Sequence, residues 1–182
     1  MTNKLTKTKR IAYIGICAAL IAVCSWISIP LTIPFTLQTF AVFLACGLLG
    51  GCDGTIAVVI YVLLGAIGLP VFAGFTGGFG ILLSNTGGYI IGFIATALVM
   101  WLFEKIFGRK TRVLILSMVL GLLVCYAFGT LWFIKVYSQA NGAISVGLAL
   151  SWCVIPYIIP DLVKIALAFI LTKRIRPHIL KD

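Results

Sequence analysis

The sequence predicts an all-α membrane protein, with six transmembrane helices in one integral membrane domain over residues 1–182. Composition is the first observation: hydrophobic residues make up 62% of the chain, charged residues only 10%, and mean hydropathy is +1.21. A soluble domain needs far more polar surface. The second observation is a series of apolar runs separated by prolines, glycines and charged clusters. The third is that the N-terminal segment, residues 104–112 and the C-terminal tail hold four basic residues each, 12 of the 14.

The first apolar run, residues 11–29, follows four basic residues and is long enough to cross a hydrocarbon core of ~30 Å. A secretory signal peptide begins in the same way, but its apolar region covers only ~7–15 residues. We therefore expect a retained helix. Gly15, Ala18, Ala19 and Ala22 within it form overlapping small-xxx-small pairs, which allow another helix to approach closely.

Residues 28–38 contain Pro30 and Pro34, which break regular helix, so we expect a loop that dips toward the bilayer. Two short or tilted helices follow, at 39–49 and 55–67. Glycines and Asp53 between them predict a tight turn at residues 50–54. The glycine-rich stretch 68–80 lacks the GxxxxGK[ST] pattern of a phosphate-binding loop. It predicts a flexible apolar loop that folds over a site.

The second half of the chain predicts longer helices. Gly88 and Gly92 form a GxxxG step for close packing. A basic loop at 104–112 and a polar connection at 137–147 separate the next runs, and Pro156 and Pro160 interrupt the last one. The six helices are expected at about 11–29, 39–49, 55–67, 86–107, 113–136 and 148–172.

Charge sets the orientation of these helices. The three clusters hold four basic residues each, whereas the loops 28–38, 68–84 and 137–160 carry none. Since basic residues stay on the cytoplasmic side, six helices with both termini in the cytoplasm satisfy the rule throughout.

Asp161 and Lys164 are the candidate site, because they place an acid and a base three residues apart in an otherwise apolar helix. Charges at membrane depth are costly and usually face a protein interior at a functional site. We expect Pro160 to be the first residue of the helix, Asp161 to lie near the positive end of its dipole and Lys164 one turn on. An internal ion pair that only fixes helix packing is the alternative.

Helix geometry locates this pair. Asp161 lies 12 residues before Lys173, or ~18 Å at 1.5 Å per residue, which is the outer half of a ~30 Å core. The loops at 28–38 and 68–84 and Asn85 reach the same level. We therefore expect an outward-facing ligand pocket near Asp161.

Several classes of function are disfavoured. The basic residues flank apolar spans and anchor the protein in the lipid bilayer, so nucleic-acid binding is not expected. The six cysteines form no CxxC pair, which argues against zinc and redox motifs. The only histidine, His178, lies in the basic tail, so no catalytic set is visible. We expect no metal, no cofactor and no enzyme activity. An ion-coupled secondary carrier of a small organic solute, with Asp161 titrating, is an open alternative.

Four segments carry a resemblance to a known family: IPFTLQTFAVF at 33–43, GAIGLPVF at 65–72, TGGYIIGF at 86–93 and PDLVK at 160–164. They resemble the biotin-specific substrate-capture subunits (S components, the BioY family) of energy-coupling factor transporters. The four motifs occur in the same order as in that family, and the resemblance covers almost the whole chain. One departure is Ser84-Asn85 before Thr86, where many relatives have Gly-Pro.

The resemblance implies a prokaryotic plasma-membrane protein that binds biotin from outside. It also implies a transmembrane coupling subunit and two cytoplasmic ATPases as partners, with the helix at 11–29 contacting the coupling subunit at Ala18 and Ala22. Asp161 would accept hydrogen bonds from the ureido N–H groups of biotin, and Lys164 would donate to its carbonyl or its carboxylate.

The remaining polar contacts would come from the amides of Asn85 and Gln38, which both donate and accept. Aromatic side chains would wall the apolar bicycle, although simple packing is the alternative for each. The candidates are Phe35, Phe72, Tyr89, Trp132 and Tyr157.

Overall fold

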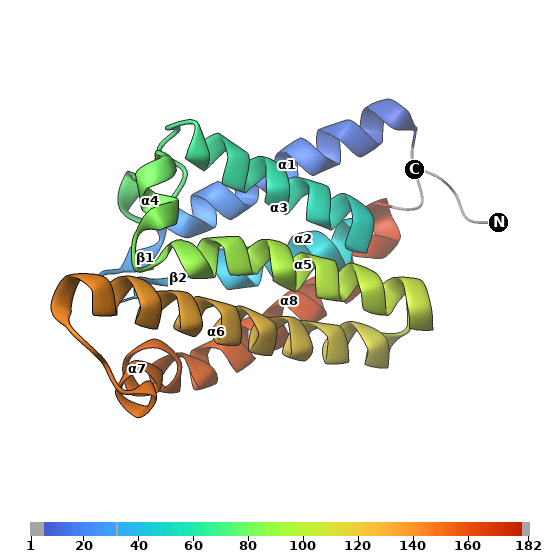
Figure 1. Cartoon of the computed structure of the whole chain (residues 1–182). Coiled ribbons are helices and arrows are strands. Elements are labelled where there is room, and N and C mark those ends of the chain that lie inside the picture. The colour runs from blue at the N-terminus through green and yellow to red at the C-terminus, as the bar shows by residue number, and fades with distance from the viewer. Residues whose placement is uncertain (1–5, 32, 180–182) are drawn as a thin grey trace.

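The computed structural model describes residues 6–31 and 33–179 of the chain and is largely helical (Figure 1). Within these ranges, four helical segments are long and apolar enough to cross a membrane. They are α1 (Lys7–Trp26), α5 (Gly87–Phe107), α6 (Thr111–Asn141) and the segment Val146–Ile179. Two shorter apolar helices, α2 (Gln38–Leu49) and α3 (Gly51–Ala66), accompany them.

The central helix is α2, which packs against α1, α3, α5 and α8. At 1.5 Å per residue its 12 residues extend ~18 Å, well short of a ~30 Å hydrocarbon core. Ten of the 12 are buried. The helix is therefore surrounded by other helices along its sides.

Glycines bring α5 and α6 into close contact along their length. A Cβ added at Gly88 would overlap Trp132, and one added at Gly129 would overlap the ring of Tyr89. Gly92 lies directly against Cys125. The close packing predicted from the Gly88–Gly92 step is therefore confirmed.

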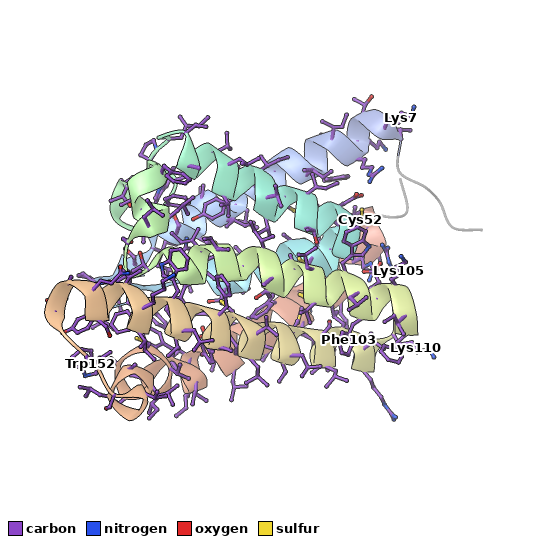
Figure 2. All side chains as sticks on the ribbon, in the orientation of Figure 1. Lys7, Cys52, Phe103, Lys105, Lys110 and Trp152 are labelled. Atoms are coloured by element: carbon purple, nitrogen blue, oxygen red, sulfur yellow. The ribbon has the colours of Figure 1, made fainter. Side chains whose placement is uncertain are left out.

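Basic residues gather at one end of the bundle, where Figure 2 places Lys7, Lys105 and Lys110, while Trp152 lies at the opposite end. Acidic side chains tie helix ends together at the basic end. Asp53 near the start of α3 accepts hydrogen bonds from the guanidinium of Arg10 on α1, with Nε–Oδ2 at 2.8 Å. Glu104 on α5 accepts from the Gly51 N–H at 2.8 Å and from Arg109.

The opposite end carries short elements that cover the helices (Figure 1). Strands β1 (Ser28–Ile29) and β2 (Phe35–Thr36) pair antiparallel, with Ser28 opposite Thr36. A 3₁₀ turn at Ala73–Phe75 and the short helix α4 (Phe79–Leu83) follow α3. The last segment of the chain comprises α7 (Val146–Cys153), a 3₁₀ turn at Ile155–Tyr157 and α8 (Ile158–Ile179).

Several predicted boundaries are corrected. Residues 28–38 contain the β1–β2 pair and are not a plain loop. The turn predicted at residues 50–54 is shorter, since only Gly50, with φ of 90°, is non-helical between α2 and α3. Residues 51–54 form the first turn of α3, where the positive end of the helix dipole favours the negative charge of Asp53. Helix α6 continues to Asn141, beyond the end predicted at residue 136, because the polar residues after that point remain helical. The helix ends at Gly142, whose φ is 89°.

The last predicted helix, 148–172, is in fact two helices that meet at the 3₁₀ turn. Pro156 lies in that turn, where its missing N–H costs nothing. Pro160 is the third residue of α8 and not the first, but it still belongs to the turn whose N–H groups have no intrahelical partner.

Candidate functional site

A cavity of about 230 Å³ lies between the short elements at one end and the helices beneath them. Helices α2, α5, α6 and α8 all contribute to its wall. Most lining side chains are apolar or aromatic, with a few polar groups among them, as in pockets for small organic ligands. The polar lining residues are Thr36, Gln38, Thr39, Thr76, Thr86, Asp161 and Lys164, and the tyrosines that add hydroxyl groups are Tyr89, Tyr126 and Tyr157.

Asp161 and Lys164 form a buried ion pair on this wall, with Nζ–Oδ1 at 2.7 Å. The spacing of three residues puts both side chains on one face of α8, and that face is turned toward α2 and α6. Asp161 is only 3% exposed and Lys164 only 4%. Two charges this deeply buried need further polar partners.

Those partners come from other elements. Thr39 on α2 donates to Asp161 Oδ1 at 3.2 Å and accepts from Lys164 Nζ at 3.3 Å. Tyr126 on α6 donates its hydroxyl to Asp161 Oδ2 at 2.5 Å. Lys164 Nζ also lies 4.2 Å from the ring centroid of Phe35 on β2, a cation–π contact. The pair is therefore held from three elements besides its own helix.

This network leaves hydrogen-bonding capacity unused on both charges. A carboxylate offers about four lone-pair sites, and Asp161 uses three of them, two on Oδ1 and one on Oδ2. An ammonium group has three N–H donors, and Lys164 uses two in hydrogen bonds. One acceptor site and one donor remain for a ligand that carries both kinds of group.

Gln38 provides a second polar group on the cavity wall. Its amide oxygen accepts from Thr36 Oγ1 at 2.9 Å, and its amide nitrogen donates to the hydroxyl of buried Tyr61. These contacts fix the orientation of the amide. One N–H and one lone pair are left over, so Gln38 can still donate to a ligand or accept from it.

Three of the predicted aromatic residues line the cavity. Tyr89 is fixed by a hydrogen bond between its hydroxyl and Thr130 Oγ1 at 2.9 Å. Tyr157 donates its hydroxyl to the carbonyl of Ile33. Phe72 is 1% exposed and meets the Tyr61 ring edge-on at 5.7 Å. These anchored rings form the apolar wall of the cavity.

Three other predicted ligand residues do not line the cavity. Trp132 packs over Gly88 and donates from Nε1 to the carbonyl of Ser84 at 3.0 Å, so it supports the turn before α5. Asn85 lies in that turn, but the lining residue there is its neighbour Thr86. The ring of Phe35 contacts the Lys164 ammonium group and stabilises its charge, but it does not line the cavity.

Sequence reasoning missed several lining residues. Thr39 follows Gln38 directly within the quoted 33–43 motif, so its position could have suggested it. Tyr126 lies in an apolar run with no motif, and only the packing of α6 against α8 brings it to Asp161. Cys125 and Cys153 also line the cavity, and no motif marks them as site residues.

The partner face predicted on α1 also needs correction. Ala18 is 3% exposed and Ala22 is 7% exposed, so both pack inside the chain's own bundle, where α1 contacts α2 and α3. The open face of α1 carries Gly15 and Ala19, which have the same spacing. A Cβ added at Gly15 would meet no atom within 4 Å.

Fold and site together define a multi-pass membrane protein with an internal site for a small polar ligand. Residues 1–181 match the BioY family, and the chain belongs to that family. It is 44% identical over 164 residues to the biotin transporter BioY of Thermotoga maritima, covering 89% of this chain and 92% of that protein. It is 40% identical over 172 residues to the probable biotin transporter BioY of Pyrococcus horikoshii, covering 93% and 98%.

A solved structure agrees with these relatives. The crystal structure of the S-component for biotin from an ECF-type ABC transporter superposes with a TM-score of 0.82 at 26% sequence identity. The likeness covers 96% of this chain and 95% of that one. Together with the apolar helices, the comparisons place this chain among multi-pass proteins of the cell membrane.

Proposed function

We propose that this chain captures biotin and delivers it for uptake, as the substrate-specific subunit of an energy-coupling factor transporter. The observation that carries the proposal is the buried Asp161–Lys164 pair, which keeps one free acceptor site and one free donor on a cavity with aromatic walls. Membership of the BioY family supports the choice of biotin as the ligand.

The chemistry of biotin suits this cavity. Its ureido group has two N–H donors, which suit the free lone pairs of Asp161 and Gln38. Lys164 donates to the ureido carbonyl or to the carboxylate of the tail. The apolar bicycle packs between the rings of Tyr89 and Tyr157. The cavity offers few polar groups in an apolar wall. Hydrogen bonds to the ureido ring therefore distinguish biotin from other apolar molecules of similar size.

The topology we propose has six membrane crossings, with both termini in the cytoplasm and the cavity facing outward. The distribution of basic residues supports it, since 12 of the 14 lie in the N-terminal segment, in residues 104–112 and in the C-terminal tail. Helices α2 and α3 serve as two of the crossings. Helix α2 is almost wholly buried among other helices, so its short length need not match the bilayer thickness, and the 16 residues of α3 extend ~24 Å. The cavity lies at the end opposite to these three clusters (Figure 2).

The chain itself is non-catalytic in this proposal. ATP hydrolysis is supplied by two cytoplasmic ATPases and transmitted by a transmembrane coupling subunit. We propose the open α1 face with Gly15 and Ala19 as the contact for that subunit, in place of the buried pair Ala18 and Ala22. Small residues allow a partner helix to approach closely, and the neighbouring Ile16, 61% exposed, adds apolar contact area.

Binding of radiolabelled biotin to the purified chain tests the proposal directly. Unlabelled biotin is expected to displace the label, whereas pentanoic acid, which carries only the tail, is not. Absence of saturable binding by folded protein would refute biotin capture. Liposomes that hold the chain without ATPases separate the carrier alternative: ion-driven biotin uptake there would favour a secondary carrier with Asp161 titrating.

A further inference from the structure

A second cavity, of about 220 Å³, lies at the basic end of the bundle, away from the site above. The end of α2, the α5–α6 connection, the first turn of α6 and the end of α8 form its walls. Four basic side chains line it, Arg109, Lys110, Lys173 and Arg176, and we call it the basic cavity.

The charges of the basic cavity are poorly compensated. Among the described residues, Glu104 is the single acid in its lining, and it already accepts from Arg109 and from the Gly51 N–H. Within residues 6–31 and 33–179, no carboxylate pairs with Lys110, Lys173 or Arg176. Arg176 is half-buried, although burying an unpaired charge is unfavourable. The cavity therefore carries a positive charge that an anion would neutralise.

Two further features of its wall suit an anion that also accepts hydrogen bonds. Helix α6 begins there, and Lys110 at its N-cap provides no side-chain acceptor for the first N–H groups. The N-terminus of a 31-residue helix favours anions through its free N–H groups and its dipole. Thr172 also lines the cavity, is 1% exposed, and its buried hydroxyl has no hydrogen-bond partner in the described part of the chain.

The surroundings indicate that the anion is attached to an acyl chain. Within two positions of lining residues in the sequence stand exposed apolar side chains, among them Ile106 at 61%, Phe107 at 53% and Ile170 at 47%. On a membrane protein these side chains face lipid tails. A basic pocket between helices at such a border is suited to a lipid phosphate.

We propose that the basic cavity binds the phosphate group of an anionic lipid such as phosphatidylglycerol. The single negative charge of the phosphate group offsets part of the positive charge of Lys110, Lys173 and Arg176, and the lipid joins the ends of α2, α5, α6 and α8. This site lies beyond the biotin cavity, and biotin binding by the isolated chain does not depend on it.

The test uses the full chain in a neutral detergent, titrated with phosphatidylglycerol, phosphatidylcholine or inorganic phosphate. Retained lipid is counted by native mass spectrometry, and the midpoint of thermal unfolding is followed in parallel, since a ligand of the folded state raises it. Phosphatidylglycerol is expected to be retained and to raise the midpoint. Equal effects of phosphatidylcholine, or of inorganic phosphate at the same concentration, would overturn the assignment to an anionic lipid.

Matched variants test the location. Lys110→Gln with Arg176→Gln removes two lining charges and is expected to weaken phosphatidylglycerol binding on the order of tenfold. Arg112→Gln with Arg174→Gln removes the same charge from exposed positions outside the cavity and is expected to change it less than about threefold. Equal losses in both doubles, or no loss in the first, would overturn the proposal.

A third variant keeps the test decisive if the charge variants fold poorly. Thr172→Val removes only the orphan hydroxyl, so the lipid-free protein is expected to unfold at a higher temperature, while the shift caused by phosphatidylglycerol becomes smaller. An unchanged lipid-induced shift would count against the cavity as the site. Biotin binding, measured on every variant, is expected to equal that of the parent chain. It therefore reports folding and biotin capture independently of lipid.

Discussion

Replacing the Asp161–Lys164 pair one partner at a time and then together separates its role in stability from its role in binding. The two side chains are 5% and 6% exposed, with 2.7 Å between charged atoms. Lys164→Met leaves the carboxylate with only the hydroxyls of Thr39 and Tyr126. Breaking a buried pair in this way costs about 3–5 kcal/mol, and because two donors remain we expect about 3 kcal/mol.

Asp161→Asn is expected to cost a similar amount, because it leaves the buried Lys164 ammonium without an opposite charge, with only an amide oxygen, one hydroxyl and an aromatic ring as partners. The double variant buries no charge. Replacement of a whole buried pair is often nearly neutral, so its stability should lie within about 1 kcal/mol of the parent. The two single effects are then strongly non-additive, as expected for partners in direct contact.

Binding is expected to follow a different course. If the pair holds biotin, the double variant regains stability and still binds biotin about 10- to 100-fold more weakly, since each hydrogen bond to a charged group contributes about 1.5–3 kcal/mol. Denaturant unfolding in detergent measures the first quantity and radiolabelled biotin the second. A double variant that recovers both stability and affinity would show that the pair only fixes helix packing. A double variant as unstable as the single ones would refute the reasoning on pairing.

Three further predictions concern other parts of the molecule. Tyr126→Phe removes one donor to Asp161 and should lower biotin affinity by about tenfold, measured by equilibrium binding; unchanged affinity would mean that this hydroxyl has no role in holding the carboxylate. A cysteine at Thr76 should react with an impermeant thiol reagent in intact cells, and one at Lys110 only after permeabilisation; labelling at Lys110 in intact cells would contradict the proposed orientation. Gly15→Trp with Ala19→Trp should leave biotin binding intact but abolish ATP-driven uptake with the partner subunits, and normal uptake would place the partner elsewhere.

Much of the cavity could be predicted from sequence because charge inside an apolar helix is a strong signal. Asp161 and Lys164 stood out for that reason, and Gln38, Tyr89 and Tyr157 lie in or beside motifs that reach the same level. Asn85 and Trp132 were also predicted to contact the ligand, but they do not line the cavity. Asn85 belongs to a non-helical turn, where neither periodicity nor spacing determines which side chain faces inward, and Trp132 is turned away by its contact with Gly88.

The face of α1 could not be predicted for a different reason. Gly15 and Ala19 have the same spacing as Ala18 and Ala22, and both pairs lie in a continuous apolar run. In a soluble protein the polar face of a helix reveals which side is buried. In a membrane the lipid and the protein interior are both apolar, so only tertiary packing decides that Ala18 and Ala22 are buried.

Gly50 has a consequence for how the chain is threaded through the bilayer. It is the single residue between α2 and α3, and its φ of 90° is a conformation that side chains with a Cβ rarely adopt. A Cβ there would also overlap the guanidinium of Arg109. In the proposed topology the chain turns back at Gly50, and a chain that stayed helical there would cross only once between residue 38 and residue 66. The parity of every later crossing would invert, and the basic clusters at 104–112 and in the tail would lie across the bilayer from the N-terminal one.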